Sequence, residues 1–153
     1  MIRVTTKRYT FQLVQDAAET YPMRSQLLSP RDVARVAHEL IGTEITECLL
    51  AFFLNARQRV TGYAEIARGT LNATRFTPRD VLTPALHAAC CGIVLVHNHP
   101  SGDVEASRAD RMATAALRQA CQVIGLELVD HVIVGPGGEH YSFRDREQWD
   151  VEE

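Results

Sequence analysis

One stretch of the sequence decides the fold: IVLVHNHPSGDVEASRAD, residues 93–110. Its first four residues are apolar and mostly β-branched, which is typical of a buried strand that ends near His97. Pro100, Ser101 and Gly102 then favour a turn. Ser107 is a good N-cap, so a helix is predicted over 108–124, closed by Gly125. The stretch therefore predicts a buried strand, a polar loop and a helix in succession.

The same signals outside this stretch predict further elements. Ser29-Pro30 and Thr77-Pro78 each combine an N-cap with a proline at the first helical position. Pro84 should kink the second of these helices. The helix over 108–124 is expected to turn Met112, Ala115, Ala116, Leu117 and Val123 inward. The predicted helices are 30–41, 78–91 and 108–124, and the predicted strands are 47–54, 60–66, 93–97, 126–134 and 140–143.

Helices that alternate with strands indicate an α/β (α+β) fold, in which helices flank a mixed β-sheet. The two strands near 47–66 form a hairpin, so at least one strand pair is antiparallel. We expect three segments: an N-terminal arm with a strand around Tyr9 to Leu13 (1–28), a central domain (29–143), and an acidic C-terminal tail (144–153).

Composition limits the classes of protein that fit. The chain has 153 residues, of which 46% are hydrophobic, and a formal net charge of −3. Such a balance excludes a histone-like, strongly basic nucleic-acid binder. No run of 18 apolar residues is present, so no membrane span is expected. The four cysteines form no C-x-x-C pair, and we expect buried free thiols in a reducing cytoplasm.

The chemistry is expected at His97, His99 and Asp110. Residues two apart on an extended chain point to the same side, so the two imidazoles can converge at the end of the strand. Asp110 lies in the first turn of the following helix, where its carboxylate can face the strand end. Two imidazoles and one carboxylate form a ligand set for Zn²⁺ that leaves a fourth position for water. The alternative is that Ser107 and Asp110 serve only the helix start.

These residues resemble a known motif. His97-x-His99-Pro100, six residues, Ser107, two residues and Asp110 match the JAMM (MPN+) metalloprotease pattern H-x-H-P-x6-S-x2-D. The resemblance is closest to the RadC family, which carries a JAB-like domain, and it covers about residues 29–143. It rests on the HNHPSG core, the SRAD helix start, RGTLNATRFTPRDV before them and LVDHVIV after them.

The resemblance implies a fold and a mechanism. The fold would be JAB/MPN-like, with layers similar to those of cytidine deaminases. His97, His99 and Asp110 would bind zinc, Ser107 would help to hold the oxyanion or the water, and Glu47 would be the general base. Glu65, on the neighbouring strand, is the second choice for that base. The reaction would be hydrolysis of a peptide or isopeptide bond, with a peptide or a ubiquitin-like protein as substrate.

Two other classes of function stay open. The chain could be a RadC-type protein associated with DNA and its repair, or a catalytically silent MPN-like binding module. The complete ligand set argues against the silent module. The acidic net charge, and the lack of likeness between residues 1–28 and the family's N-terminal helical region, argue against tight DNA binding. The sequence indicates no oligomeric state.

Two weaker signals have two readings each. Asp130 and His131 lie in a predicted buried strand, where they form a satisfied core pair or else His131 orients a metal ligand. Arg108, Arg111 and Arg118 share one face of the predicted helix 108–124, which is either a solvated face or a patch for an acidic substrate.

Overall fold

A computed structural model of the chain describes residues 29–69 and 76–147. A five-stranded sheet forms its centre, in the order β2-β1-β3-β4-β5. Strands β3 and β4 are parallel and the other neighbouring pairs are antiparallel, so the sheet is mixed, as predicted. The strands are β1 (Glu47–Leu54), β2 (Val60–Gly69), β3 (Gly92–Asn98), β4 (Glu127–Val134) and β5 (His140–Ser142).

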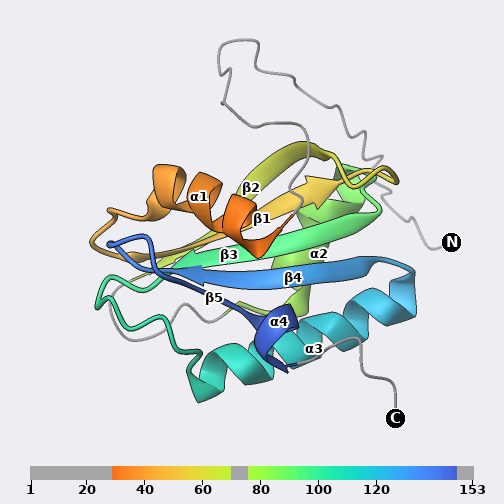
Figure 1. Ribbon diagram of the computed structural model, residues 1–153. Helices are drawn as coiled ribbons and strands as arrows, with labels where there is room; N and C mark the ends of the chain where they lie inside the picture. The colour runs from red at the N-terminus through yellow and green to blue at the C-terminus, as the bar shows by residue number, and fades with distance from the viewer. Residues whose placement is uncertain (1–28, 70–75, 148–153) are drawn as a thin grey trace, which may run out of the picture.

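Helices cover both faces of this sheet, which confirms the predicted α+β architecture. Figure 1 shows α1 on one side of the sheet and α3 on the other. Helix α2 packs with α3, and α4 follows directly after β5. The helices are α1 (Pro30–Ile41), α2 (Pro78–His87), α3 (Arg108–Ile124) and α4 (Phe143–Glu147).

The central strands are buried on both faces, which explains their continuous apolar sequences. Leu50 and Phe52 of β1 face α1, whereas Leu49, Ala51 and Phe53 face α2 and α3. Strand β3 alternates in the same way, so its odd-numbered residues face α3. This parity places His97 on the α3 side of the sheet.

The helix starts agree with the predictions. Ser29 accepts a hydrogen bond from the Asp32 amide at 3.2 Å, and Ser107 accepts one from the Asp110 amide at 3.1 Å. Gly125 closes α3 with φ +74°, a left-handed conformation that glycine adopts at little cost.

Helix α2 is shorter than predicted. It contains Pro84 but ends at His87, not at Cys91. Ala89 adopts a positive φ of 48°, and the Cys91 amide donates to the Leu54 carbonyl at 2.7 Å. The chain therefore leaves the helix early because its backbone must join the sheet before β3.

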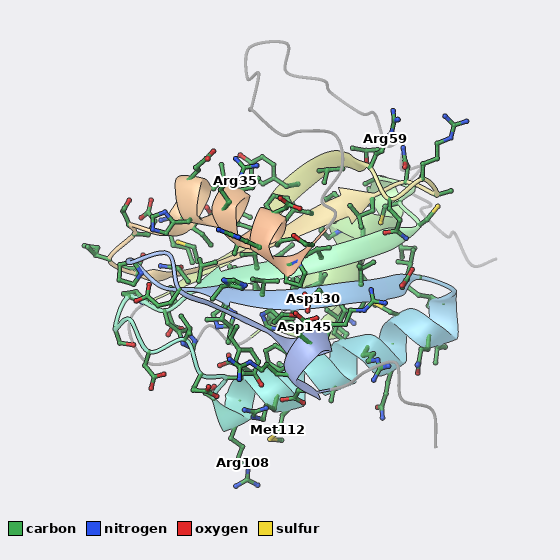
Figure 2. The ribbon with its side chains drawn as sticks, viewed as in Figure 1. Arg35, Arg59, Arg108, Met112, Asp130 and Asp145 are labelled. Atoms are coloured by element: carbon green, nitrogen blue, oxygen red, sulfur yellow. The ribbon has the colours of Figure 1, made fainter. Side chains whose placement is uncertain are left out.

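The buried face of α3 also differs from the prediction. Met112 and Val123, expected inside, are 64% and 86% exposed, and Ala115 and Ala116 are exposed too. Figure 2 shows Met112 pointing away from the sheet, beside Arg108. Of the five residues expected inside, Leu117 alone is buried. The buried side chains are Thr114, Leu117 and Cys121.

The end of the described chain holds a helix that the sequence did not indicate. Residues 143–147 form α4, so the predicted tail 144–153 begins inside a helix. The Asp130 carboxylate accepts hydrogen bonds from the Ser142 hydroxyl at 2.7 Å and from the Arg144 amide at 3.0 Å. This buried carboxylate holds the first turn of α4. The predictions for residues 1–28 and 148–153 concern residues outside those that the structure describes.

Cys48, Cys90 and Cys121 are buried free thiols, as predicted, whereas Cys91 is exposed. Across residues 29–69 and 76–147, no helix has both the length and the apolar character that a membrane span needs.

Candidate metal centre

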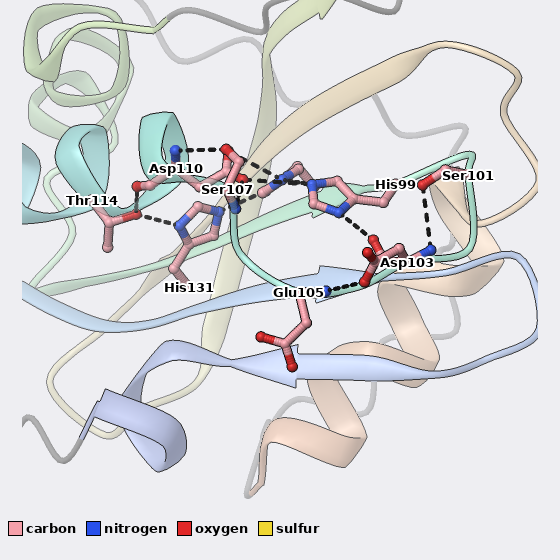
Figure 3. Close-up of polar contacts among 9 residues, drawn as sticks. His99, Ser101, Asp103, Glu105, Ser107, Asp110, Thr114 and His131 are labelled. Atoms are coloured by element: carbon pink, nitrogen blue, oxygen red, sulfur yellow. Dashed lines mark hydrogen bonds and ion pairs between the residues drawn. The ribbon is translucent and has the colours of Figure 1, made fainter.

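His97, His99 and Asp110 meet at one end of the parallel strand pair. His97 is next to last in β3, and the His99 amide donates to the Val134 carbonyl at 2.9 Å, so the chain stays extended beyond the strand. The two Nε2 atoms are 2.9 Å apart. Asp110 brings one oxygen to 3.5 Å from His97 Nε2 and the other to 3.6 Å from His99 Nε2. The structure therefore assembles the predicted triad, of which Figure 3 labels His99 and Asp110.

The start of α3 aims the Asp110 carboxylate. The Ser107 amide donates to Asp110 Oδ2 at 2.8 Å, while the Asp110 amide donates to Ser107 Oγ at 3.1 Å. This reciprocal pair is a capping box. Asp110 thus takes part in the helix start and also faces the two imidazoles. Ser107 Oγ acts as an acceptor here, and its hydroxyl hydrogen is not used by the cap.

The donor atoms fit a metal ion. One ligand atom from each member of the triad lies within 4.8 Å of the others. His99 Nδ1 is 2.7 Å from the Asp103 carbonyl, which can only accept, so a proton belongs on Nδ1 and Nε2 is the ring nitrogen that faces the triad. Neutral imidazoles and a carboxylate are ligands that zinc prefers. Ligand atoms of these kinds at these distances could hold a metal ion.

Burial and mutual contacts shift the pKa of each member of the triad. Burial lowers the pKa of His97 to about 4, against the opposing effect of Asp110, so His97 is neutral at pH 7. Burial also disfavours the charge on His99, but its hydrogen bond to Asp110 outweighs this and raises the pKa. Burial alone would raise the pKa of Asp110; the hydrogen bond from His99, the nearby His97 and Ser107 hold it well below its ordinary value.

Glu47 and Glu65 lie on opposite faces of the sheet. Leu49 pairs with His97 in the β1–β3 register, and Glu47, two residues before Leu49, faces the same side. The Glu47 charge is among those that raise the pKa of His99. Glu65 pairs with Leu50, whose side chain faces α1. The structure thus brings Glu47 toward the triad and does not bring Glu65 there.

Glu65 is also engaged elsewhere. Arg68 donates to its two carboxylate oxygens at 3.0 and 2.9 Å and reaches Glu44 at 2.9 Å. The hydrogen bond from Arg68 lowers the pKa of Glu65, which makes this carboxylate a weaker base.

Three further residues, Asn98, His131 and Thr114, lie beside the triad. Asn98 is 1% exposed and binds the backbone of Glu44, Thr46 and Cys48 around Glu47. His131 Nε2 is 2.8 Å from His97 Nδ1, so His131 contacts a triad member, whereas Asp130 pairs with Val94, which faces α1. Thr114 contacts His131 in turn at 2.7 Å. Sequence reasoning missed Asn98 and Thr114; the signal for Thr114 was its position one turn after Asp110.

Arg108 and Arg111 of α3 point in different directions. Arg108 projects away from the body of the molecule (Figure 2). Arg111 instead contacts the Tyr141 hydroxyl at 3.1 Å and pairs with Glu147 of α4. These contacts join α3 to the C-terminal elements.

Comparison with known proteins agrees with this geometry. The family model for a RadC-like JAB domain matches residues 27–149. A UPF0758 protein of Chlorobium phaeovibrioides is 44% identical over 118 residues, which cover 77% of this chain and 52% of the relative. Relatives of the same name from Variovorax paradoxus and Streptococcus sanguinis are 40% and 36% identical, over 84% and 80% of this chain and 57% and 53% of their own lengths.

The chain thus spans about half the length of the curated relatives it matches. The family match covers most of the sequence and includes every residue of the triad. On the strength of this match, the chain belongs to the RadC-like JAB domain family.

Proposed function

We propose that this protein is a zinc-dependent hydrolase that cleaves a peptide or isopeptide bond. The observation that carries the proposal is the convergence of two imidazole nitrogens and one carboxylate at the end of β3. A zinc ion held by these ligands would lower the pKa of water in its open fourth position and polarise a substrate carbonyl.

Glu47 is the proposed general base. It lies on the triad's side of the sheet and close enough for its charge to act on His99. It accepts a proton from the attacking water as the water oxygen bonds to the carbonyl carbon. It then donates that proton to the leaving amine as the carbon–nitrogen bond breaks, so the products are a carboxylic acid and an amine.

Ser107 is the proposed oxyanion donor. Its oxygen accepts from the Asp110 amide, and its hydroxyl hydrogen is free of that cap. The hydrogen can therefore be donated to the charge that develops on the substrate oxygen. The start of α3 fixes Ser107 and Asp110 together, so the donor keeps a constant position relative to the carboxylate ligand.

The choice of peptide or isopeptide substrates rests on the resemblance to JAMM proteins. Its test compares wild-type protein with Glu47→Gln and, as the matched control on the opposite face, Glu65→Gln. Each is stripped with a chelator and reloaded with zinc. Bound zinc is then measured by mass spectrometry, and hydrolysis is measured on a panel of peptide and ubiquitin-like isopeptide substrates.

We expect all three proteins to bind one zinc ion each. Glu47→Gln should lose roughly 10²- to 10⁴-fold in turnover, the range typical for loss of a general acid–base group, whereas Glu65→Gln should keep wild-type turnover. Unchanged turnover in Glu47→Gln would refute the role of Glu47. Failure of the wild-type protein to retain zinc would refute the metal site itself.

A further inference from the structure

A second layer of polar residues lies behind His97, and the proposed mechanism does not use it. His131 of β4 is fully buried, and Thr114 of α3 is 2% exposed. His131 Nε2 lies 2.8 Å from His97 Nδ1, and His131 Nδ1 lies 2.7 Å from Thr114 Oγ1. The Phe143 ring stacks on His131 at 4.7 Å with a 6° angle between the planes, which fixes the plane of the imidazole.

The direction of each hydrogen bond in this series of contacts can be worked out by starting from Thr114. Thr114 Oγ1 donates its one hydrogen to the Asp110 backbone carbonyl at 2.6 Å, because a carbonyl can only accept. Thr114 Oγ1 must therefore accept from His131 Nδ1–H. A fully buried imidazole favours its neutral form, so His131 Nε2 carries a lone pair and accepts from His97 Nδ1–H.

The direction of these hydrogen bonds decides whether His97 Nε2, the atom that faces the triad, carries a hydrogen. His97 is buried as well, and its one hydrogen is on Nδ1. Its Nε2 is therefore unprotonated and presents a lone pair toward His99 and Asp110, which is the form that binds a metal ion. The opposite tautomer would place a hydrogen between His97 and the other two ligands.

The contacts also form a closed ring. Asp110 contributes its carboxylate to the triad, while its backbone carbonyl accepts from Thr114. From Thr114 the ring passes to His131 (Figure 3), and from there to His97 and back to the triad. Helix α3 and strands β3 and β4 are thus tied together at the level of the ligands.

We propose that His131 and Thr114 are positioning residues that hold His97 in its metal-binding tautomer and fix α3 against β3. The proposal rests on the metal site proposed above and assigns its supporting residues. Neither residue touches the substrate or the metal, so both act through His97 and Asp110.

The test compares Thr114→Val, which removes the hydroxyl at nearly constant size, with Thr114→Ser, which keeps it. Val132→Ala is the matched control, because Val132 is a fully buried neighbour of His131 that faces α1. Two quantities are measured for each: the zinc dissociation constant, by competition with a chelator, and the His97 tautomer in the metal-free protein, by ¹⁵N NMR of the imidazole nitrogens.

Thr114→Val should bind zinc roughly 10- to 100-fold more weakly, the usual effect of losing an outer hydrogen-bond partner. Its His97 should show a mixture of tautomers, because His131 Nδ1 has lost its acceptor. Thr114→Ser should restore both values. Val132→Ala should be less stable to urea, yet keep the wild-type zinc affinity and tautomer.

The proposal is overturned if Thr114→Val keeps the wild-type affinity and tautomer, or if Val132→Ala weakens zinc binding as much as Thr114→Val does. If the wild-type protein binds no zinc, the proposed function fails. The tautomer of His97 in the metal-free protein then still decides this inference: a hydrogen on Nε2 in the wild type overturns it.

Discussion

Asn98→Ala should destabilise the protein strongly, although Asn98 lies outside the triad. Its Oδ1 accepts from the Cys48 amide at 2.7 Å, and its Nδ2 donates to the Thr46 and Glu44 carbonyls at 3.1 and 3.2 Å. Alanine removes all three hydrogen bonds and leaves the Cys48 amide buried without its partner. At about 1 kcal/mol for each hydrogen bond, we expect a loss of about 3 kcal/mol.

The assay is urea-induced unfolding of the metal-free protein, followed by circular dichroism. A loss of about 3 kcal/mol would also lower Tm by about 10 °C. Asn55→Ala is the matched control, because Asn55 Oδ1 also accepts two backbone bonds, from Arg57 and Arg59, but in an exposed turn. The reasoning is refuted if Asn98→Ala costs no more free energy of unfolding than Asn55→Ala does.

Two further predictions concern the cysteines and α2. Native protein treated with iodoacetamide should be alkylated at Cys91, while Cys90 and Cys121 stay protected. Both protected thiols are buried, and burial raises the pKa of Cys121 to about 11. Equal labelling of Cys91 and Cys121, measured by mass spectrometry, would contradict this prediction. The Thr77 amide and hydroxyl donate to the Asp80 carboxylate and lower its pKa. The charged carboxylate therefore stabilises the fold at pH values above the unfolded pKa of about 4. This contribution is lost as the pH falls through the lower pKa of the folded protein. Asp80→Asn should therefore cost less than about 1 kcal/mol near neutral pH, and the gap to wild type in urea unfolding should shrink toward about pH 3; a gap that does not change with pH would rule out the carboxylate's role.

The sequence was sufficient wherever the signal is local. Ser29, Ser107 and Gly125 mark helix ends through their own backbone chemistry, and the structure has those ends where predicted. The triad was predictable for the same reason, because residues 97–110 contain all three members and the strand, turn and helix start that orient them.

The sequence failed where the deciding contact comes from elsewhere in the chain. Hydrophobicity could not find the inner face of α3, because polar Thr114 occupies it through a bond to His131 on β4. Helix α4 depends on Asp130, which is distant in sequence. The sequence ranked Glu47 ahead of Glu65 by resemblance alone; which face of the sheet each occupies depends on strand register, including a shift between Leu49 and Leu50 that no period-two pattern reveals.

The ring of hydrogen bonds behind His97 has a consequence for the order of folding. During synthesis the chain emerges from its N-terminus, so His97, His99 and Asp110 leave the ribosome before His131 does. A metal ion that arrived at this stage would meet the three proposed ligands without the support of β4. Its hold would then tighten in a second step, when β4 pairs with β3 and His131 reaches His97. Metal capture and strand pairing would thus reinforce each other late in folding.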